Sequence, residues 1–330
     1  MIWKGPFEDR ITQSLIGRFL QCPFRFYLYA GLGYDPFLEL NDNLVWGDTF
    51  HKALELSLRM PKQICELTEE ELGRLEAEVG SYLATKYPTY PRTFVTSIMY
   101  MLRLYDDSFK EEGPVVTEKV FDFEYNIPGE GTVTFSGKVD GLVNSTLVEH
   151  KCKGKINPDQ TSDEIPVDVQ VNLYAKAMEA NEVIYDLIRI PDTQWSLPQK
   201  REFQKPDNYI KELYTKRKWG DFPVYDNKNR WYSQIRMPLN KEEIENCFQR
   251  TIIPVVKKMI RWYEHVTSPG FDIDNSECYN DVFYITPIRQ FDPSRTEYYK
   301  SDFHDYMVGN TYLEGYPRVK SMFNELEEET

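Results

Sequence analysis

Alternating apolar and polar residues predict two adjacent β-strands in the middle of the chain. Residues 132–143 (TVTFSGKVDGLV) and 147–152 (LVEHKC) have strand-like composition, and Asn144-Ser145 marks a turn between them. Side chains alternate across a strand, so a two-residue turn would pair Val143 with Thr146. The face that we expect to meet the core would then carry Val139, Gly141, Val143, Val148 and Cys152.

The opposite face of this predicted hairpin carries unusual charge. With a two-residue turn, Asp140 lies opposite Glu149, and two carboxylates so placed repel each other. A divalent cation between them, with Lys151 beside it, would offset the repulsion and suit phosphodiester cleavage. A solvated hairpin with diagonal pairs Asp140–Lys151 and Lys138–Glu149 is the alternative, and a longer loop would change the register.

The flanking sequence predicts an α/β (α+β) protein with a mixed β-sheet flanked by helices. Ser14 is the expected N-cap of a helical segment that Pro23 interrupts, and Asp168 is an expected cap further on. Apolar spacing predicts helices over 11–32, 45–60, 68–86, 93–111, 165–181, 207–219 and 241–265. The remaining predicted strands are 115–125, 183–190 and 231–237.

Composition and charge narrow the classes of function. The chain has 330 residues and a net charge of −14, which counts against general affinity for nucleic acid. Residues 189–230, however, hold ten Lys/Arg and six Asp/Glu, a local net charge of +4. The apolar runs are too short to span a membrane and the first residues do not resemble a secretory signal, so we expect a cytoplasmic protein.

Six short motifs occur in the order typical of one family. They are the opening Ser14, Ile16, Phe19, Cys22-Pro23 and Phe26-Tyr27; Gly47 with His51; Glu118 to Phe123; Gly137 to Asp140; Glu149 to Lys151; and Gln170 with Tyr174. Each is weak alone, and spacing by itself leaves His51, Gln170 and Tyr174 as ordinary core or surface residues. Together and in this order, they resemble the RecB-type nucleases of the PD-(D/E)xK superfamily.

The resemblance implies a restriction-endonuclease-like fold and a metal-dependent DNA nuclease. It suggests an exonuclease or end-processing enzyme of recombination, repair or phage replication, acting in a bacterial or phage-infected cytoplasm. DNA ends, single- or double-stranded, would be its substrate, and replication or recombination proteins its partners. We expect one nuclease domain over 1–330, with a helical insertion at 52–112, a catalytic core at 113–190 and a basic, aromatic C-terminal portion at 191–330.

Two other functions stay open at this point. One is a catalytically silent DNA-binding or bridging subunit that keeps the nuclease fold. The other is a metal-stabilised structural protein without a nucleic-acid role, which only the acidic net charge favours.

The resemblance also assigns roles to particular residues. Mg²⁺ or Mn²⁺ would be held by His51, Asp140, Glu149 and the backbone carbonyl of His150, since hard cations prefer oxygen ligands. Lys151 would orient the attacking water and stabilise charge on the phosphate. Supporting roles fall to Gln170, Tyr174 and Glu118, and expected phosphate contacts to Lys153, Lys155, Lys257 and Lys258.

Cysteine usage separates this chain from many of the nucleases that it resembles. Many of them bind an iron–sulfur cluster through four cysteines, whereas only Cys22 and Cys278 stand near the corresponding places here. We therefore expect no iron–sulfur cluster. The five cysteines include no CxxC pair, which favours reduced thiols, and the chain has no Walker-A motif for a helicase motor.

Overall fold

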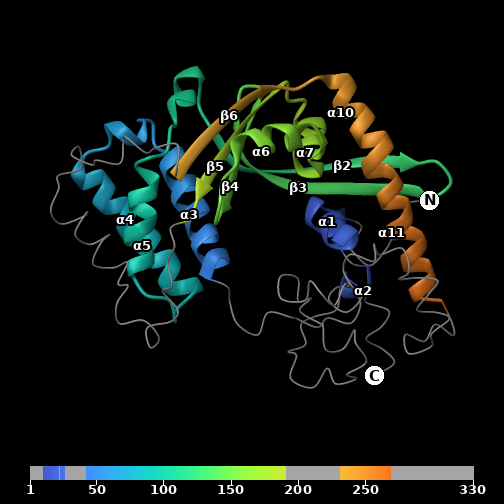
Figure 1. Cartoon of the computed structure of the whole chain (residues 1–330), viewed down its shortest axis with the longest axis horizontal. Helices are drawn as coiled ribbons and strands as arrows, with labels where there is room; N and C mark the ends of the chain where they lie inside the picture. The colour runs from blue at the N-terminus through green and yellow to red at the C-terminus, as the bar shows by residue number, and fades with distance from the viewer. Residues whose placement is uncertain (1–9, 22, 27–41, 191–230, 269–330) are drawn as a thin grey trace. The chain divides into compact units, whose positions relative to one another are not determined.

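A mixed β-sheet flanked by helices forms the framework of the protein, as the sequence predicts (Figure 1). The computed structural model describes residues 10–21, 23–26, 42–190 and 231–268. The strands are β1 (Arg10–Ile11), β2 (Val116–Ile127), β3 (Gly131–Val143), β4 (Thr146–Lys153), β5 (Glu182–Arg189) and β6 (Tyr232–Pro238). Their order is β1-β3-β4-β5-β6, and β2 also pairs with β3.

The described residues fall into two compact units. The hairpin unit takes its residues from 42–120 and 138–244, and the terminal unit takes its residues from 10–26, 121–137 and 245–268. Strand β3 contributes to both units. The expected division into a 52–112 insertion, a 113–190 core and a C-terminal portion stays a prediction.

The central hairpin has the predicted two-residue turn and register. β3 and β4 pair antiparallel through Gly141↔Val148, Leu142↔Leu147 and Val143↔Thr146. Asn144 takes a φ of +51°, a left-handed conformation that asparagine tolerates better than most residues. β4 then runs parallel to β5 along its whole length, and β5 is antiparallel to β6.

The hairpin is buried on both faces, although the sequence predicts only one core face. Val143 and Val148 lie in the core as predicted, but Leu142 and Leu147, on the opposite face, are buried too. Helix α7 reaches this second face (Figure 1), and its Gln170 contacts Lys151. The alternative of a solvated hairpin is therefore wrong.

Helices α3 (Asp42–Leu58), α4 (Glu69–Lys86) and α5 (Thr93–Leu102) pack together in the hairpin unit (Figure 1). Trp46 stacks on Phe50 at 5.0 Å between ring centroids, and its indole N–H donates to Ser97 Oγ at 2.8 Å. Burying each such side chain contributes about 1.5–3 kcal/mol, and the hydrogen bond removes the cost of burying the indole N–H. This packing fixes α3 against α5.

The predicted helix over 93–111 is wrong beyond Leu102. A 3₁₀ helix, Ser108–Glu112, follows instead. Asp107 is buried there and accepts a hydrogen bond from the backbone N–H of Ile64 at 3.0 Å, a long-range contact that local spacing does not reveal.

The predicted helix over 165–181 is divided in the structure. α6 (Pro158–Glu164) and a 3₁₀ turn (Ile165–Val167) precede α7 (Val169–Met178). Asp168 caps α7 as predicted, because its Oδ1 accepts from the N–H groups of Gln170 at 2.7 Å and Val171 at 3.0 Å. The cap fixes the orientation of the first turn of α7, which carries Gln170.

The terminal unit contains α1 (Gln13–Gln21), α2 (Pro23–Phe26) and α11 (Ile253–Val266). The rings of Phe19, Phe26 and Trp262 meet edge to face at 5.4–5.7 Å between centroids. Ser14 is not the N-cap, because α1 begins one residue earlier and Thr12 Oγ1 accepts from the N–H of Leu15 at 3.3 Å.

The structure confirms four other predicted elements, and a fifth lies outside the described residues. The helix over 241–265 is confirmed as α10 (Lys241–Cys247), a π turn (Phe248–Ile252) and α11 in succession. The strands over 115–125, 183–190 and 231–237 are confirmed as β2, β5 and β6. The helix predicted over 207–219 lies outside the described residues.

Candidate active site

Four residues singled out in the sequence lie on three elements of the hairpin unit. His51 is on α3, Asp140 on β3, and Glu149 and Lys151 are on β4. His51 Nδ1 lies 3.6 Å from Asp140 Oδ1, and Lys151 Nζ lies 2.7 Å from Glu149 Oε1. His51, Asp140 and Lys151 keep partial exposure, so the cluster can be reached from solvent.

Close packing of α3 against β4 brings His51 to this place. A Cβ built on Gly47 would lie 3.5 Å from the Cβ of Cys152, an ordinary van der Waals contact. His51 follows one turn later, on the same side of the helix. Gly47 therefore marks where α3 packs against β4, and His51 is the candidate site residue one turn further along the same helix face.

Asp140 is held as an anion. It lies one residue beyond the β3–β4 ladder, and its Oδ2 accepts from the backbone N–H of His150 at 3.0 Å. Burial alone would raise the pKa of Asp140, but the neighbouring imidazoles of His150 and His51 outweigh it and hold the pKa well below its usual range. Burial likewise opposes the charge on His51, yet Asp140 raises the pKa of His51 well above its ordinary value.

The pKa of Glu149 shifts in the opposite direction to that of Asp140, although a lysine lies beside Glu149. It is 3% exposed, and its Oε1 accepts from Lys151 and from the Gln170 side-chain amide. Burial and the nearby Asp140 charge outweigh Lys151 and raise the pKa of Glu149 to about 8. The buried Glu149 and the half-buried Asp140 thus compete for limited positive charge, which a bound cation would relieve.

Lys151 is fixed by two partners. Its Nζ lies 2.7 Å from Glu149 Oε1 and 2.6 Å from Gln170 Oε1. Burial would lower the pKa of Lys151, but the Glu149 carboxylate outweighs it and raises the pKa, so the ammonium stays charged. Its Nζ also lies 5.9 Å from the centroid of the Tyr185 ring.

Helix α7 supplies the two supporting residues. Gln170 contacts both Glu149 and Lys151, and Tyr174 follows one turn later and is buried. Burial and the Glu149 and Asp140 charges raise the pKa of Tyr174, so its hydroxyl stays protonated. The structure therefore brings the Gln170 and Tyr174 pair to the carboxylates.

The remaining predicted site residues lie elsewhere. Glu118, at a φ of +55° on β2, forms an ion pair with Lys138, which replaces the Lys138–Glu149 pair of the solvated-hairpin alternative. Lys153 ends β4, and Lys155 is exposed just after it. Lys257 and Lys258 are on α11 in the terminal unit, where Lys257 Nζ lies 3.4 Å from the Pro128 carbonyl oxygen.

Most of the basic stretch, at 191–230, and both Cys22 and Cys278 lie outside the described residues. The absence of an iron–sulfur cluster therefore stays a prediction. Within the described part, Trp231 lies under the guanidinium of Arg189, 5.0 Å from its ring centroid, so this tryptophan already has a cationic neighbour.

Sequence reasoning missed the side chain of His150. It is 2% exposed, its Nδ1 lies 3.5 Å from Asp140 Oδ2, and its Nε2 lies 2.8 Å from Tyr105 Oη. Side-chain donor atoms of His51, Asp140 and His150 all lie within 4.8 Å of one another. The histidine is visible in the sequence, but its partners are distant along the chain. Local spacing therefore does not reveal that its side chain faces the site.

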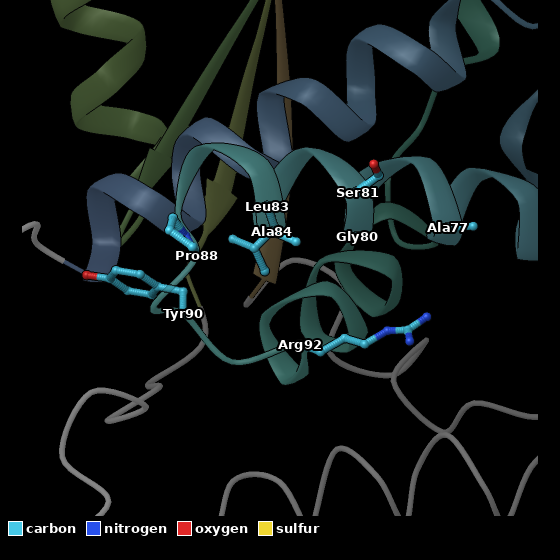
Figure 2. A pocket seen from close by; sticks show the side chains of 8 residues that line it. All are labelled: Ala77, Gly80, Ser81, Leu83, Ala84, Pro88, Tyr90 and Arg92. Atoms are coloured by element: carbon cyan, nitrogen blue, oxygen red, sulfur yellow. The ribbon is translucent and has the colours of Figure 1, made fainter.

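One described cavity lies apart from these residues (Figure 2). It has a volume of about 340 Å³ beside α4. Its lining consists of Ala77, Gly80, Ser81, Leu83, Ala84, Pro88, Tyr90 and Arg92. This lining contains no carboxylate, imidazole or thiol, so the hairpin is the better candidate for metal-assisted chemistry.

Comparison with known proteins defines the class. A family profile described as "PD-(D/E)XK nuclease superfamily" matches residues 10–259. The chain therefore belongs to the PD-(D/E)XK nuclease superfamily, whose members use divalent metals.

Two solved structures have low sequence identity and low structural similarity to this chain. The structure titled "Crystal structure of SSO0001" is 16% identical with a TM-score of 0.28, over 71% of this chain and 93% of that one. A phage-related exonuclease from Haemophilus somnus 129PT is 13% identical with a TM-score of 0.31, over 66% of this chain and 95% of that one. No curated protein matches the chain.

The donor set fits a divalent metal. Carboxylate oxygens of Asp140 and Glu149 and the imidazole of His51 are ligands that Mg²⁺ or Mn²⁺ accepts. The competition between Asp140 and Glu149 for positive charge is the electrostatic reason for a cation here. Among the helices in the described ranges, none is both long and apolar enough to cross a bilayer.

Proposed function

We propose that this protein hydrolyses phosphodiester bonds of DNA with the help of a divalent metal, as an exonuclease or end-processing enzyme. The observation that carries the proposal is the convergence of His51, Asp140, Glu149 and Lys151 at one end of the hairpin. Recombination, repair or phage replication is the process that the resemblance suggests for such an enzyme.

The metal would be held by Asp140, Glu149 and His51, with the His150 carbonyl as a further oxygen ligand. When bound, it would polarise the scissile phosphate and lower the pKa of a water molecule. Lys151 would orient that water and stabilise the charge that develops on the phosphate. Gln170 would keep Lys151 in place, because its Oε1 already accepts from the ammonium.

Substrate contacts beyond the site rest on charge. The 189–230 stretch, Lys153, Lys155, Lys257 and Lys258 would meet phosphates, which position a nucleic acid without reading its sequence. Tyr174 would brace the site directly, and Glu118 would support it through its ion pair with Lys138 on β3. The acidic net charge of −14 makes such local contacts more necessary, because the chain as a whole repels DNA.

A catalytically silent DNA-binding subunit is the second candidate. The intact set of charged residues speaks against it, since both Lys151 and Gln170 donate hydrogen bonds to Glu149. A subunit that only bound DNA would have no use for an ammonium held against a buried carboxylate.

Incubation with end-labelled linear DNA tests the proposal. Single- and double-stranded substrates and a covalently closed circle would be supplied with Mg²⁺, Mn²⁺ or EDTA. We expect stepwise shortening of linear DNA that needs the metal, with the circle spared. Cutting of the circle would contradict action at ends, and intact DNA under every condition would contradict the nuclease proposal.

A further inference from the structure

A buried carboxylate beside the site collects several hydrogen bonds. Asp186 on β5 is 0% exposed. The hydroxyl of Tyr105 donates to its Oδ2 at 2.7 Å, and the hydroxyl of Tyr232 donates to its Oδ1 at 2.7 Å. The Gln234 amide also donates to Oδ1, at 2.9 Å. Burial raises the pKa of Asp186, whereas these three donors favour its ionised form, which only accepts.

Tyr105 then fixes the tautomer of His150. A phenol hydroxyl has a single proton, and that of Tyr105 points to Asp186. The contact of 2.8 Å between Tyr105 Oη and His150 Nε2 therefore requires the imidazole to donate. With the proton on Nε2, the lone pair that the ring can offer to a metal is the one on Nδ1.

That lone pair faces the candidate metal site. His150 Nδ1 lies 3.5 Å from Asp140 Oδ2, and the rings of His150 and His51 meet edge to face at 5.8 Å between centroids. The donor atoms of the two histidines and Asp140 lie within 4.8 Å of one another, a spacing that one ion could bridge. The second nitrogen is held by a buried partner, as is usual for metal-binding histidines.

We propose that the side chain of His150 is itself a metal ligand through Nδ1, and that Tyr105 and Asp186 are positioning residues that set its tautomer. The inference rests on the proposed function and deepens the same site. Two imidazoles and a carboxylate suit a divalent transition metal better than Mg²⁺, which prefers oxygen. The site would therefore select Mn²⁺ over Mg²⁺.

Metal binding by His150→Gln tests the side chain apart from the backbone, because the substitution retains the main-chain carbonyl. Mn²⁺ and Mg²⁺ affinities would be measured without DNA, by electron paramagnetic resonance for Mn²⁺ and competition for Mg²⁺. We expect Mn²⁺ affinity to fall at least about tenfold with a smaller change for Mg²⁺. An unchanged Mn²⁺ to Mg²⁺ ratio in a folded variant would overturn the proposal.

A measurement on the unmodified chain covers the case in which His150→Gln does not fold. With ¹⁵N-labelled histidine and Zn²⁺ as a diamagnetic metal, the imidazole spectrum should show His150 protonated at Nε2 and shifted at Nδ1. A proton on Nδ1, or an Nδ1 resonance that Zn²⁺ leaves in place, would overturn the assignment.

Tyr105→Phe tests the positioning role. It removes the acceptor of the His150 Nε2 proton, and Mn²⁺ affinity and the Mn²⁺ to Mg²⁺ ratio should fall several-fold. Tyr125→Phe is the matched control, because its hydroxyl accepts from Gln249 in the terminal unit, and it should change neither quantity. Equal effects of the two variants would contradict the role of Tyr105.

These readouts separate the inference from the proposed function. A protein that binds Mn²⁺ through His150 but leaves all DNA intact would refute the nuclease proposal alone. A protein that cleaves DNA but binds Mn²⁺ equally well after His150→Gln would refute this inference alone.

Discussion

Replacing Lys151 by alanine is expected to slow DNA cleavage by about 10²–10³-fold, the usual cost of removing one group that stabilises transition-state charge. Mn²⁺ binding should not weaken, because Lys151 is a cation and competes for Glu149 rather than binding the metal. The measurement is single-turnover cleavage at saturating Mn²⁺, with Mn²⁺ affinity from separate titrations. Loss of rate with retained metal would place Lys151 in the chemical step.

Lys241→Ala is the matched control for this variant. Lys241 begins α10 and is exposed, so its loss removes one positive charge without touching the site. Cleavage by Lys241→Ala should stay within about twofold of wild type, as for most surface substitutions. If Lys151→Ala cleaved as fast as this control, Lys151 would have no catalytic role.

Replacing Glu149 by glutamine should abolish metal-dependent cleavage and yet stabilise the metal-free protein at higher pH. Folding raises the pKa of Glu149 to about 8, so between its ordinary value and pH 8 the folded state holds a proton that the unfolded state has lost. The free energy of unfolding of the wild type therefore falls as pH rises through this window. Glutamine does not titrate, and the variant should gain on the order of 2 kcal/mol relative to wild type between pH 5 and pH 8.

Urea unfolding in EDTA at several pH values measures this difference. Glu182→Gln is a control of opposite sign, because its ion pair with Arg236 lowers the pKa of Glu182 and stabilises the folded state at neutral pH. A difference between Glu149→Gln and wild type that did not grow with pH would show that Glu149 is an ordinary ionised carboxylate.

The hairpin and its turn could be predicted because they depend on neighbouring residues. Two strand-like runs around Asn144-Ser145 fix a register that the pairs Val143↔Thr146 and Gly141↔Val148 confirm. The Asp168 cap is equally local, since it needs only a carboxylate before a helical run. The order of short motifs led to the right superfamily.

What could not be predicted depends on contacts distant along the chain. Alternation of apolar and polar residues predicts which side chains share one face of a strand. It does not reveal that α7 covers the second face of the hairpin. His150, Tyr105 and Asp186 meet only because β5 pairs with β4 in one particular register, His150↔Asp186, and because α5 ends beside them. The early end of α5 at Leu102 likewise follows a tertiary demand around the buried Asp107.

The central claim is that a metal held at Asp140 is needed to hydrolyse DNA. Its most direct test is a Mn²⁺ titration of wild type and Asp140→Asn, with bound Mn²⁺ and single-turnover cleavage read from the same samples. The wild-type rate should rise in proportion to bound Mn²⁺, and Asp140→Asn should bind at least about tenfold more weakly and cleave at least about 10²-fold more slowly. Cleavage at the wild-type rate by Asp140→Asn, or by wild type in EDTA, would contradict the account.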